Sequence, residues 1–362
     1  MKSYNNLWNS YISNENIELA IKNAARGKRD RPSVKKKLDN PNFKNEIRDY
    51  AIHFKNKPHK PKEIYDGIKR KKRNIIVPSF EEQVIHHMVV NVLKPIFEKP
   101  MYYHSYGSIP GKGAHRGKKA IEKWIQNNGK DSKYVLKMDI QKYFDSIPHD
   151  ILFARLRQLI RDDKFFSVVE EIIKVEDCGI PLGFYTSQWI ANWYLTGLDH
   201  FIKEDLGAKF YIRYMDDMVI FDSNKRKLHK ARESIDNYLK DNLGLKLKKN
   251  WQVFRFEYHG KYRPLDFMGF LFFRNRTTLR KSIMLKASRK AKRLSKKRIT
   301  VYDCRQMMAY LGWIDCTDTY GYYLEYIKPF VNFKRLKVHI GKYDKAKEKR
   351  DGVVQKQIIR TA

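Results

Sequence analysis

The sequence predicts an α+β protein in which an antiparallel sheet is backed by helices. Two β-rich runs, 210–214 and 218–221, are separated only by Met215-Asp216-Asp217, a spacing typical of a hairpin. A third apolar run at 134–140 predicts a buried strand, and helical apolar patterns precede and follow it. These three strands are the expected centre of the fold.

The composition indicates a folded protein with a polyanionic partner. Of the 362 residues, 42% are hydrophobic and 14% aromatic, which is enough to fill real cores in two or three packed units. Subtracting 40 acidic from 75 basic residues leaves a formal charge of +35. Such a surface attracts phosphate chains and releases their counterions, so we expect nucleic acid. A solvated basic surface or a ribosome-associated protein is the alternative.

The cysteines and the apolar runs indicate the compartment. Cys178, Cys304 and Cys316 have no CxxC spacing, so neither a zinc site nor a disulfide framework is expected. The N-terminus lacks the apolar core of a signal peptide, and no run approaches the roughly 18 apolar residues of a membrane helix. We therefore expect a cytoplasmic protein with no membrane partner.

Residues 1–72 are expected to be mostly helical and basic, with a loop at 57–61. After a short β-rich run at 73–78, Ser79 and Glu82 have the spacing of a capping box. The helix that begins there should extend over 80–97, because apolar residues recur at intervals of four and would face the core.

The remaining elements follow the central strand. Helices are expected at 151–160 and 168–173, and Pro181 interrupts the chain before a helix at 188–206. Beyond Arg280 the pattern changes to basic helices, which predicts a separate small helical unit.

Three aspartates carry the strongest chemical signal. Asp139 is an isolated acid on an apolar strand, and Asp216 and Asp217 are adjacent at a hairpin tip. Carboxylates that converge from two strands repel one another unless cations lie between them. Two ions roughly 3.5 to 4 Å apart would activate a 3′ hydroxyl and stabilise a triphosphate leaving group, and hard oxygen ligands favour Mg²⁺. Alone, the acidic pair would equally suit an ordinary turn.

The surrounding sequence resembles the reverse transcriptase family in an ordered series of motifs. These are Arg73 with Pro78, Tyr106-Gly107-Ser108-Ile109-Pro110-Gly111, the Asp139 strand, Pro181-Leu182-Gly183, Tyr214-Met215-Asp216-Asp217, Leu243-Gly244-Leu245 and Phe267-Met268-Gly269. The resemblance implies a right-hand polymerase fold, α+β in class, with fingers, a palm built on the antiparallel sheet, and a helical thumb. The implied activity is RNA-directed DNA polymerisation.

The implied domains follow the chain in order. We expect a basic extension that starts the fingers (1–72), fingers (73–133), a palm with inserted finger-side helices (134–278), a helical thumb (279–342) and a basic mobile tail (343–362). This length leaves too few residues for an RNase H or HNH nuclease domain, so RNA removal and target nicking are expected from other proteins.

The resemblance assigns the metal and nucleotide positions residue by residue. Asp139 and Asp216 would be the principal ligands of two Mg²⁺ ions, with the carbonyl of Ile140 completing one site and Asp217 in support. The ring of Phe144 would lie under the sugar of the incoming nucleotide and exclude a 2′ hydroxyl. The implied substrate is therefore a dNTP, and the alternative for Phe144 is a plain core aromatic.

Further positions are expected around the nucleotide, the primer and the RNA. Arg73, within the basic cluster 70–73, would stack on the incoming base and contact the triphosphate. Gly183 would let the backbone approach the nucleotide closely. Lys249, or its neighbour Lys248, would protonate the leaving pyrophosphate, unless it is a simple surface lysine. The expected primer grip is Phe267, Met268 and Gly269, and the expected RNA-binding residues are Lys286, Arg289, Lys290 and Arg293.

One motif departs from the common family pattern Gln-Gly-x-x-x-Ser-Pro. Residues 182–188 read Leu-Gly-Phe-Tyr-Thr-Ser-Gln, which resembles the reverse transcriptases of diversity-generating retroelements. Leu182 cannot hydrogen-bond around the nucleotide sugar as glutamine can, and each lost bond is worth about 0.5–1.5 kcal/mol. The expected enzyme copies a template-repeat RNA with errors at adenine and thereby diversifies a target gene by mutagenic retrohoming.

The resemblance also implies partners and leaves alternatives open. The partners are an RNA that both templates and primes, the cDNA primer, dNTPs and a small basic oligomeric accessory protein, in a bacterial or phage-encoded system. The alternatives are an abortive-infection, retron-like or group II intron-like reverse transcriptase, and a catalytically idle RNA-binding scaffold. The presence of all three aspartates argues against the scaffold, which would need none of them.

Overall fold

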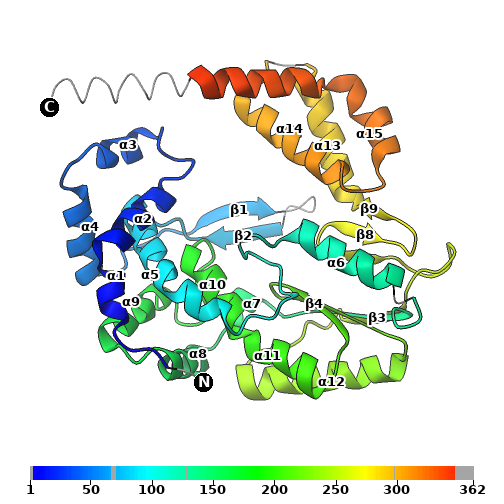
Figure 1. Cartoon of the computed structure of the whole chain (residues 1–362), viewed down its shortest axis with the longest axis horizontal. Helices are drawn as coiled ribbons and strands as arrows, with labels where there is room; N and C mark the ends of the chain where they lie inside the picture. Colours follow the sequence, from blue (N-terminus) through cyan, green and yellow to red (C-terminus); the bar gives the residue numbers. More distant parts are fainter. Residues whose placement is uncertain (1–2, 67–70, 128, 297, 347–362) are drawn as a thin grey trace. The chain divides into compact units, whose positions relative to one another are not determined.

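The computed structural model describes residues 3–66, 71–127, 129–296 and 298–346, and Figure 1 shows its elements. The chain divides into two compact units. Unit 1 comprises residues 1–117 and 129–255, and unit 2 comprises residues 118–128 and 256–362. Both units contain strands and helices, so the predicted α+β class is confirmed.

Four short helices open unit 1: α1 (Leu7–Tyr11), α2 (Asn14–Ala24), α3 (Pro32–Leu38) and α4 (Phe43–Ile52). The side chain of Ser13 caps α2 by accepting the backbone N–H of Asn16. α3 begins at Pro32. Proline suits the first position of a helix, because a backbone N–H at that position would have no partner within the helix. The prediction of a mostly helical N-terminal extension is confirmed.

A hairpin of β1 (Lys62–Asp66) and β2 (Lys71–Ile75) follows these helices. β2 overlaps the predicted run at 73–78 but begins and ends earlier. The sequence does not predict β1, because that segment is largely charged and its few apolar residues show no alternation. The residues that would join the two strands lie outside the described part of the chain.

α5 (Phe80–Glu98) is the long helix of unit 1 and begins at the predicted capping box. The Ser79 hydroxyl accepts the Glu82 backbone N–H, and the Glu82 carboxylate accepts the Ser79 backbone N–H. Its buried face packs on α2 and on α10 (Tyr185–Tyr194).

The main sheet of unit 1 is antiparallel, with strand order β4-β5-β3-β6. The turn Met215-Asp216 joins β4 to β5, and the register places Asp139 opposite Asp217. Side chains directly opposite one another in such a pair project from the same face of the sheet. The strands are β3 (Tyr134–Asp139), β4 (Phe210–Tyr214), β5 (Asp217–Asp222) and β6 (Gln252–Arg255).

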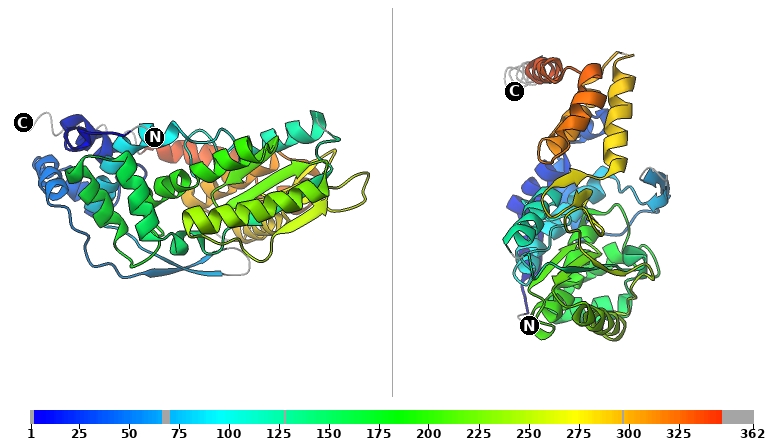
Figure 2. Two further views of the ribbon diagram at one scale, coloured as in Figure 1. Left: turned by 90° about the horizontal axis from the view of Figure 1, so that it is seen from below. Right: turned by 90° about the vertical axis from the view of Figure 1, so that its right-hand side faces the viewer.

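One long helix packs on this sheet. α12 (Lys225–Leu243) packs on β3, β5 and β6 and runs along the sheet in Figure 2. The others are α7 (Tyr143–Ser146), α8 (His149–Leu159), α9 (Asp163–Ile173), α11 (Thr196–His200) and a π-helical turn, Phe201–Asp205. The prediction of one helix at 188–206 is wrong in two respects. α10 begins earlier, at Tyr185, and helical geometry is interrupted at Leu195.

Unit 2 combines a small sheet with helices. The antiparallel sheet contains β7 (Leu265–Phe267), β8 (Phe270–Phe272) and β9 (Thr277–Leu279). α13 (Lys281–Leu294) and α14 (Val301–Ile314) pack side by side (Figure 2), and α15 (Tyr320–Tyr326) and a 3-10 turn, Lys328–Phe330, follow. α6 (Ala114–Asn127) begins in unit 1 and continues into unit 2.

The predicted unit after Arg280 is helical, as expected, but it shares its compact unit with β7, β8 and β9. The division into fingers, palm and thumb therefore stays a prediction. Of the expected mobile tail, residues 343–346 continue a helix that begins at 333, and the rest lies outside the described residues. No helix in the described ranges is both long and apolar enough to cross a membrane.

Candidate active site

A cavity of about 1030 Å³ opens beside the end of the main sheet, entirely within unit 1. Most of the residues that the sequence nominates for chemistry line it. They are Asp139, Asp216, Asp217, Arg73, Ile140, Phe144, Leu182, Lys248 and Lys249.

The three aspartates meet at one end of this cavity because the hairpin turn lies beside the end of β3. The carboxyl of Asp216 is within hydrogen-bonding reach of Asp139, and Asp217 adds a further negative charge. Burial and these two neighbours raise the pKa of Asp216 from 3.8 to about 7. The site therefore concentrates negative charge that a cation would relieve.

Lys248 is the basic group that contacts this charge. Its Nζ lies 2.5 Å from Oδ2 of Asp139, and its backbone N–H donates to the Asp139 carbonyl oxygen at 2.8 Å. The hydrogen bond to Asp139 and the neighbouring acids raise the pKa of Lys248. Lys249 also lines the cavity, but its side chain is exposed. Of the two lysines that the sequence offers here, Lys248 makes the ion pair.

The donor set fits divalent cations in its chemistry. Carboxylate oxygens are the ligands that Mg²⁺ prefers, and a cation bound here would displace the proton that the raised pKa lets Asp216 retain. Among the described residues, no group of three or more His, Cys, Asp or Glu side chains already stands in metal-binding geometry.

The predicted nucleotide-binding residues come from three separate segments. Arg73 lies on β2, Phe144 on the one-turn helix α7, and Leu182 in the link between α9 and α10. Phe144 is half-buried, and its carbonyl accepts the backbone N–H of Ile180 at 2.8 Å. That hydrogen bond ties the α7 segment to the motif that contains Leu182.

Gly183 occupies a different place from the one expected. It lines an adjacent cavity of about 480 Å³ and not the one that holds the aspartates. Its φ is +108°, and a Cβ there would clash with the backbone carbonyl of Ile76. The Ile76 N–H also donates to the Leu182 carbonyl at 2.7 Å. A close backbone contact with the residue after β2 thus explains the glycine.

The predicted primer grip is a tight turn in unit 2. Phe267 ends β7 and pairs with Phe270, so Met268 and Gly269 form a two-residue hairpin turn. Both have positive φ, 51° and 89°, as a type I′ turn requires. The Phe267 side chain is buried. Their role at a primer stays a prediction.

One of the four predicted RNA-binding residues is placed wrongly by the sequence. Lys290 is buried, and its Nζ forms an ion pair with Asp303, which also caps the start of α14. It points into the contact between α13 and α14 because it lies on the inner face of α13. Lys286, Arg289 and Arg293 are exposed on that helix and stay available to a polyanion.

The sequence did not nominate a second set of residues that hold the hairpin from behind. Arg213, Asp199 and Asn192 are fully or almost fully buried, and Arg213 donates hydrogen bonds to both of the others. A charged residue inside the apolar strand 210–214 was the available signal.

Comparison with known proteins identifies the family. The family model described as "Reverse transcriptase (RNA-dependent DNA polymerase)" matches residues 56–272. The chain belongs to this family. The match includes every residue that lines the aspartate cavity. Family membership confirms the predicted right-hand polymerase class of fold.

Individual relatives are distant and mostly longer. The chain is 31% identical over 149 residues to an uncharacterized 91 kDa protein in the cob intron of Schizosaccharomyces pombe, covering 38% of this chain and 18% of that protein. It is 26% identical over 187 residues to the retron Ec73 reverse transcriptase of Escherichia coli, covering 47% and 56% respectively. The chain thus spans less than two thirds of either relative.

Among solved structures, telomerase from Candida tropicalis in complex with a TWJ fragment of telomeric RNA is similar, with a TM-score of 0.49 at 13% identity. The similarity covers 73% of this chain and 54% of that one.

Proposed function

We propose that this chain is an RNA-directed DNA polymerase that makes error-prone, adenine-mutagenic cDNA from a template-repeat RNA. The observation that carries the polymerase assignment is a single cavity that holds Asp139, Asp216 and Asp217 together with Phe144 and Leu182. The motif at 182–188 supports the finer assignment to a diversity-generating retroelement.

In this proposal the acidic, aromatic and arginine side chains of the cavity have separate tasks. Asp139 and Asp216 would hold two Mg²⁺ ions, with the Ile140 carbonyl and Asp217 in support. When bound, the ions supply Lewis-acid activation of the primer 3′ hydroxyl and charge stabilisation of the triphosphate. The ring of Phe144 excludes a 2′ hydroxyl, and the planar guanidinium of Arg73 stacks on the incoming base.

Lys248 has two successive roles in the proposal. In the free protein its ammonium balances the charge of Asp139, with Nζ 2.5 Å from Oδ2. The same ammonium lines the cavity, where it would donate a proton to the leaving pyrophosphate. Lys249 faces the same cavity and is the alternative donor.

Primer extension on an RNA template with Mg²⁺ and dNTPs tests the polymerase. Asp216→Asn should abolish synthesis while RNA affinity stays close to that of wild type, because the substitution removes a ligand and no phosphate contact. Asp222→Asn is the matched control, since it removes a carboxylate from the other end of the same strand. More than a few per cent of residual activity in Asp216→Asn would contradict the assignment.

Sequencing of the cDNA tests the finer proposal. Wild type should err chiefly opposite template adenine, and Leu182→Gln should lower those errors by up to about tenfold, because one or two hydrogen bonds supply about 1 to 2 kcal/mol. Leu182→Met is the control, because it keeps the volume and adds no hydrogen bond. Equal errors at adenine in all three proteins would remove the physical basis for this role of Leu182.

A retron-like reverse transcriptase is the second candidate, favoured by the match to the retron Ec73 enzyme. It predicts an error rate that does not depend on the template base. The small basic accessory protein belongs to the first candidate alone and rests on the motif at 182–188.

A further inference from the structure

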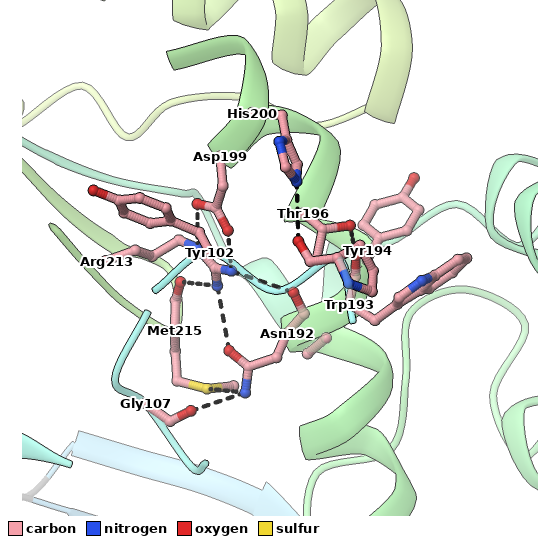
Figure 3. A network of polar contacts seen from close by, with 12 residues as sticks. Tyr102, Gly107, Asn192, Trp193, Tyr194, Thr196, Asp199, His200, Arg213 and Met215 are labelled. Carbon is pink, nitrogen blue, oxygen red and sulfur yellow. Dashed lines mark hydrogen bonds and ion pairs between the residues drawn. The ribbon is translucent and has the colours of Figure 1, made fainter. Parts of the chain in front are cut away.

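A buried polar network lies directly behind the catalytic hairpin, and Figure 3 shows its members. Arg213, on β4, is 0% exposed, and its guanidinium uses all five of its N–H donors. Nε and Nη2 donate to Oδ1 and Oδ2 of Asp199 at 2.7 and 2.5 Å. The remaining donors bond to the Asn192 side-chain and backbone oxygens, both at 3.3 Å, and to the Met215 carbonyl at 3.1 Å.

The ion pair at the centre of this network is costly and is secured from several sides. Asp199 is also 0% exposed, and it accepts a third hydrogen bond from the Tyr211 hydroxyl at 2.7 Å. Removing two charges from water costs several kcal/mol per ion, so apolar residues of the same volume often stabilise a fold as well or better. Stability alone is therefore a weak reason for a buried pair at this position.

What the network holds is the residue before Asp216. Met215 has a φ of +55°, a left-handed conformation that costs a non-glycine residue roughly 1–2 kcal/mol. Arg213 fixes its carbonyl, and the side-chain amide of Asn192 donates to its sulfur at 3.3 Å and to the Gly107 carbonyl at 2.8 Å. A Cβ on Gly107 would lie 2.5 Å from Met215 Cγ, so this loop closes the other side of Met215.

The backbone of Met215 decides where the carboxylate of Asp216 points. The turn that joins β4 to β5 contains only these two residues, so no other residue can absorb a change in the direction of the chain. Met215 is held at its carbonyl and at its side chain, and Asp217, the residue after the turn, is held in β5.

We propose that Arg213, Asp199 and Asn192 are positioning residues that fix Met215 in its left-handed conformation and thereby place Asp216 for metal binding. This inference rests on the proposed function, because it takes Asp216 as a metal ligand. The three residues touch neither nucleotide nor metal, and act only through the hairpin.

The test separates positioning from stability. The triple variant Tyr211→Phe, Asp199→Leu, Arg213→Met removes both charges of the ion pair and the hydroxyl that bonds to it, so that no charge is left buried and unpaired. The measurements are thermal unfolding, Mn²⁺ affinity by electron paramagnetic resonance in the absence of nucleic acid, kcat for dNTP addition, and KM for primer–template. Asp303→Asn is the control, since it breaks a buried ion pair that belongs to unit 2, whereas the hairpin belongs to unit 1.

The triple variant should unfold at nearly the wild-type temperature, yet bind Mn²⁺ about tenfold more weakly and show a similar fall in kcat, with KM for primer–template unchanged. Asp303→Asn should lower the unfolding temperature and leave Mn²⁺ affinity unchanged. Wild-type Mn²⁺ affinity in the triple variant would overturn the inference. The inference would also be overturned if the loss of Mn²⁺ affinity matched the loss of thermal stability in both the triple variant and Asp303→Asn.

Arg213→Lys is a second variant that keeps the charge. An ammonium cannot donate to Asp199, Asn192 and Met215 in the planar arrangement of a guanidinium, so a fall in Mn²⁺ affinity is expected here as well. Unchanged affinity in Arg213→Lys would show that charge, and not the placement of Met215, is what the site needs. Polymerisation by Asp216→Asn at the wild-type rate would instead refute the proposed function, before any Arg213 variant is made.

Discussion

At the scale of single residues, Asp216 is the group whose charge state the fold changes most clearly in the cavity. Its pKa is raised from 3.8 to about 7, first by burial and then by Asp139 and Asp217. The folded protein therefore binds a proton on Asp216 between these pH values, whereas the unfolded chain does not. By linkage, this group's contribution to stability is fully present below about pH 4 and is lost as the pH rises toward 7.

Asp216→Asn should consequently stabilise the metal-free protein at alkaline pH and have little effect at pH 4. The gain at pH 8 is bounded by about 4 kcal/mol, since each unit of pKa shift is worth about 1.4 kcal/mol. Thermal unfolding in EDTA between pH 4 and pH 8 measures it, with Asp222→Asn as the control for loss of a carboxylate. A gain of the same size at both pH values would contradict the cause assigned here.

Phe144 carries the second prediction at this scale. If its ring excludes the 2′ hydroxyl, Phe144→Ala should admit ribonucleotides while addition of dNTP continues. Single-nucleotide addition with rNTP and dNTP side by side measures the preference. Phe144→Tyr is the control, because it keeps the ring that blocks the sugar. An unchanged preference for dNTP in Phe144→Ala would place the sugar gate on another residue.

At the scale of elements, the contact between Ile76 and the Leu182-Gly183 step joins the end of β2 to the entrance of α10. It consists of a backbone hydrogen bond of 2.7 Å and a glycine with no room for a Cβ. This contact holds β2, which carries Arg73, in a fixed position relative to Leu182. It explains how both residues line one cavity although their segments are far apart in the sequence.

Gly183→Ala should disrupt the contact between Ile76 and the Leu182-Gly183 step. The added Cβ would meet the backbone of Ile76, which cannot move aside as a flexible side chain can, and the positive φ adds strain. We expect lower stability and a higher KM for dNTP. Gly312→Ala is the control, because that glycine lies within α14 with open space around it, where alanine should stabilise the helix by about 0.5–1 kcal/mol. Equal stability changes in the two variants would contradict the role of the contact.

At the scale of the whole molecule, the net charge of +35 dominates. A protein that neutralises the phosphates of a nucleic acid releases their counterions. The logarithm of its binding constant for the nucleic acid therefore falls by about 0.7 to 0.9 per phosphate contact for each tenfold rise in salt concentration. The exposed positions on α13 that are candidates for such contacts are Lys286, Arg289 and Arg293.

Replacing Lys286, Arg289 and Arg293 together with alanine should reduce the salt dependence of RNA binding by about two to three units, at roughly 0.7 to 0.9 per contact, and leave folding intact. Lys290→Ala should do the opposite. It should leave the salt slope unchanged and destabilise the protein, because Asp303 would stay buried without its ion-pair partner. Binding titrations at several salt concentrations, with thermal unfolding of each variant, distinguish the two. A smaller slope in Lys290→Ala would contradict its buried position.

The sequence alone determined what depends on neighbours within a few positions. The capping box of Ser79 and Glu82 and the β4–β5 hairpin follow from local spacing, whereas the placement of Asp139 opposite Asp217 depends on β3 pairing with β5, which is far away in the chain. The capping box and the hairpin could be predicted because each rests on hydrogen bonds between residues close in the chain or on strict alternation along a strand.

Only the tertiary structure decided which charged residues lie inside and what they contact. Lys290 resembles its exposed neighbours in the sequence but faces Asp303, and Arg213 meets Asp199 and Asn192 from another element. Gly183 is required by Ile76, far away in the chain. The physical reason is that the partner of a buried polar group depends on how separate elements pack together. The periodicity of one element predicts which of its faces is apolar, but not which residues of another element pack against that face.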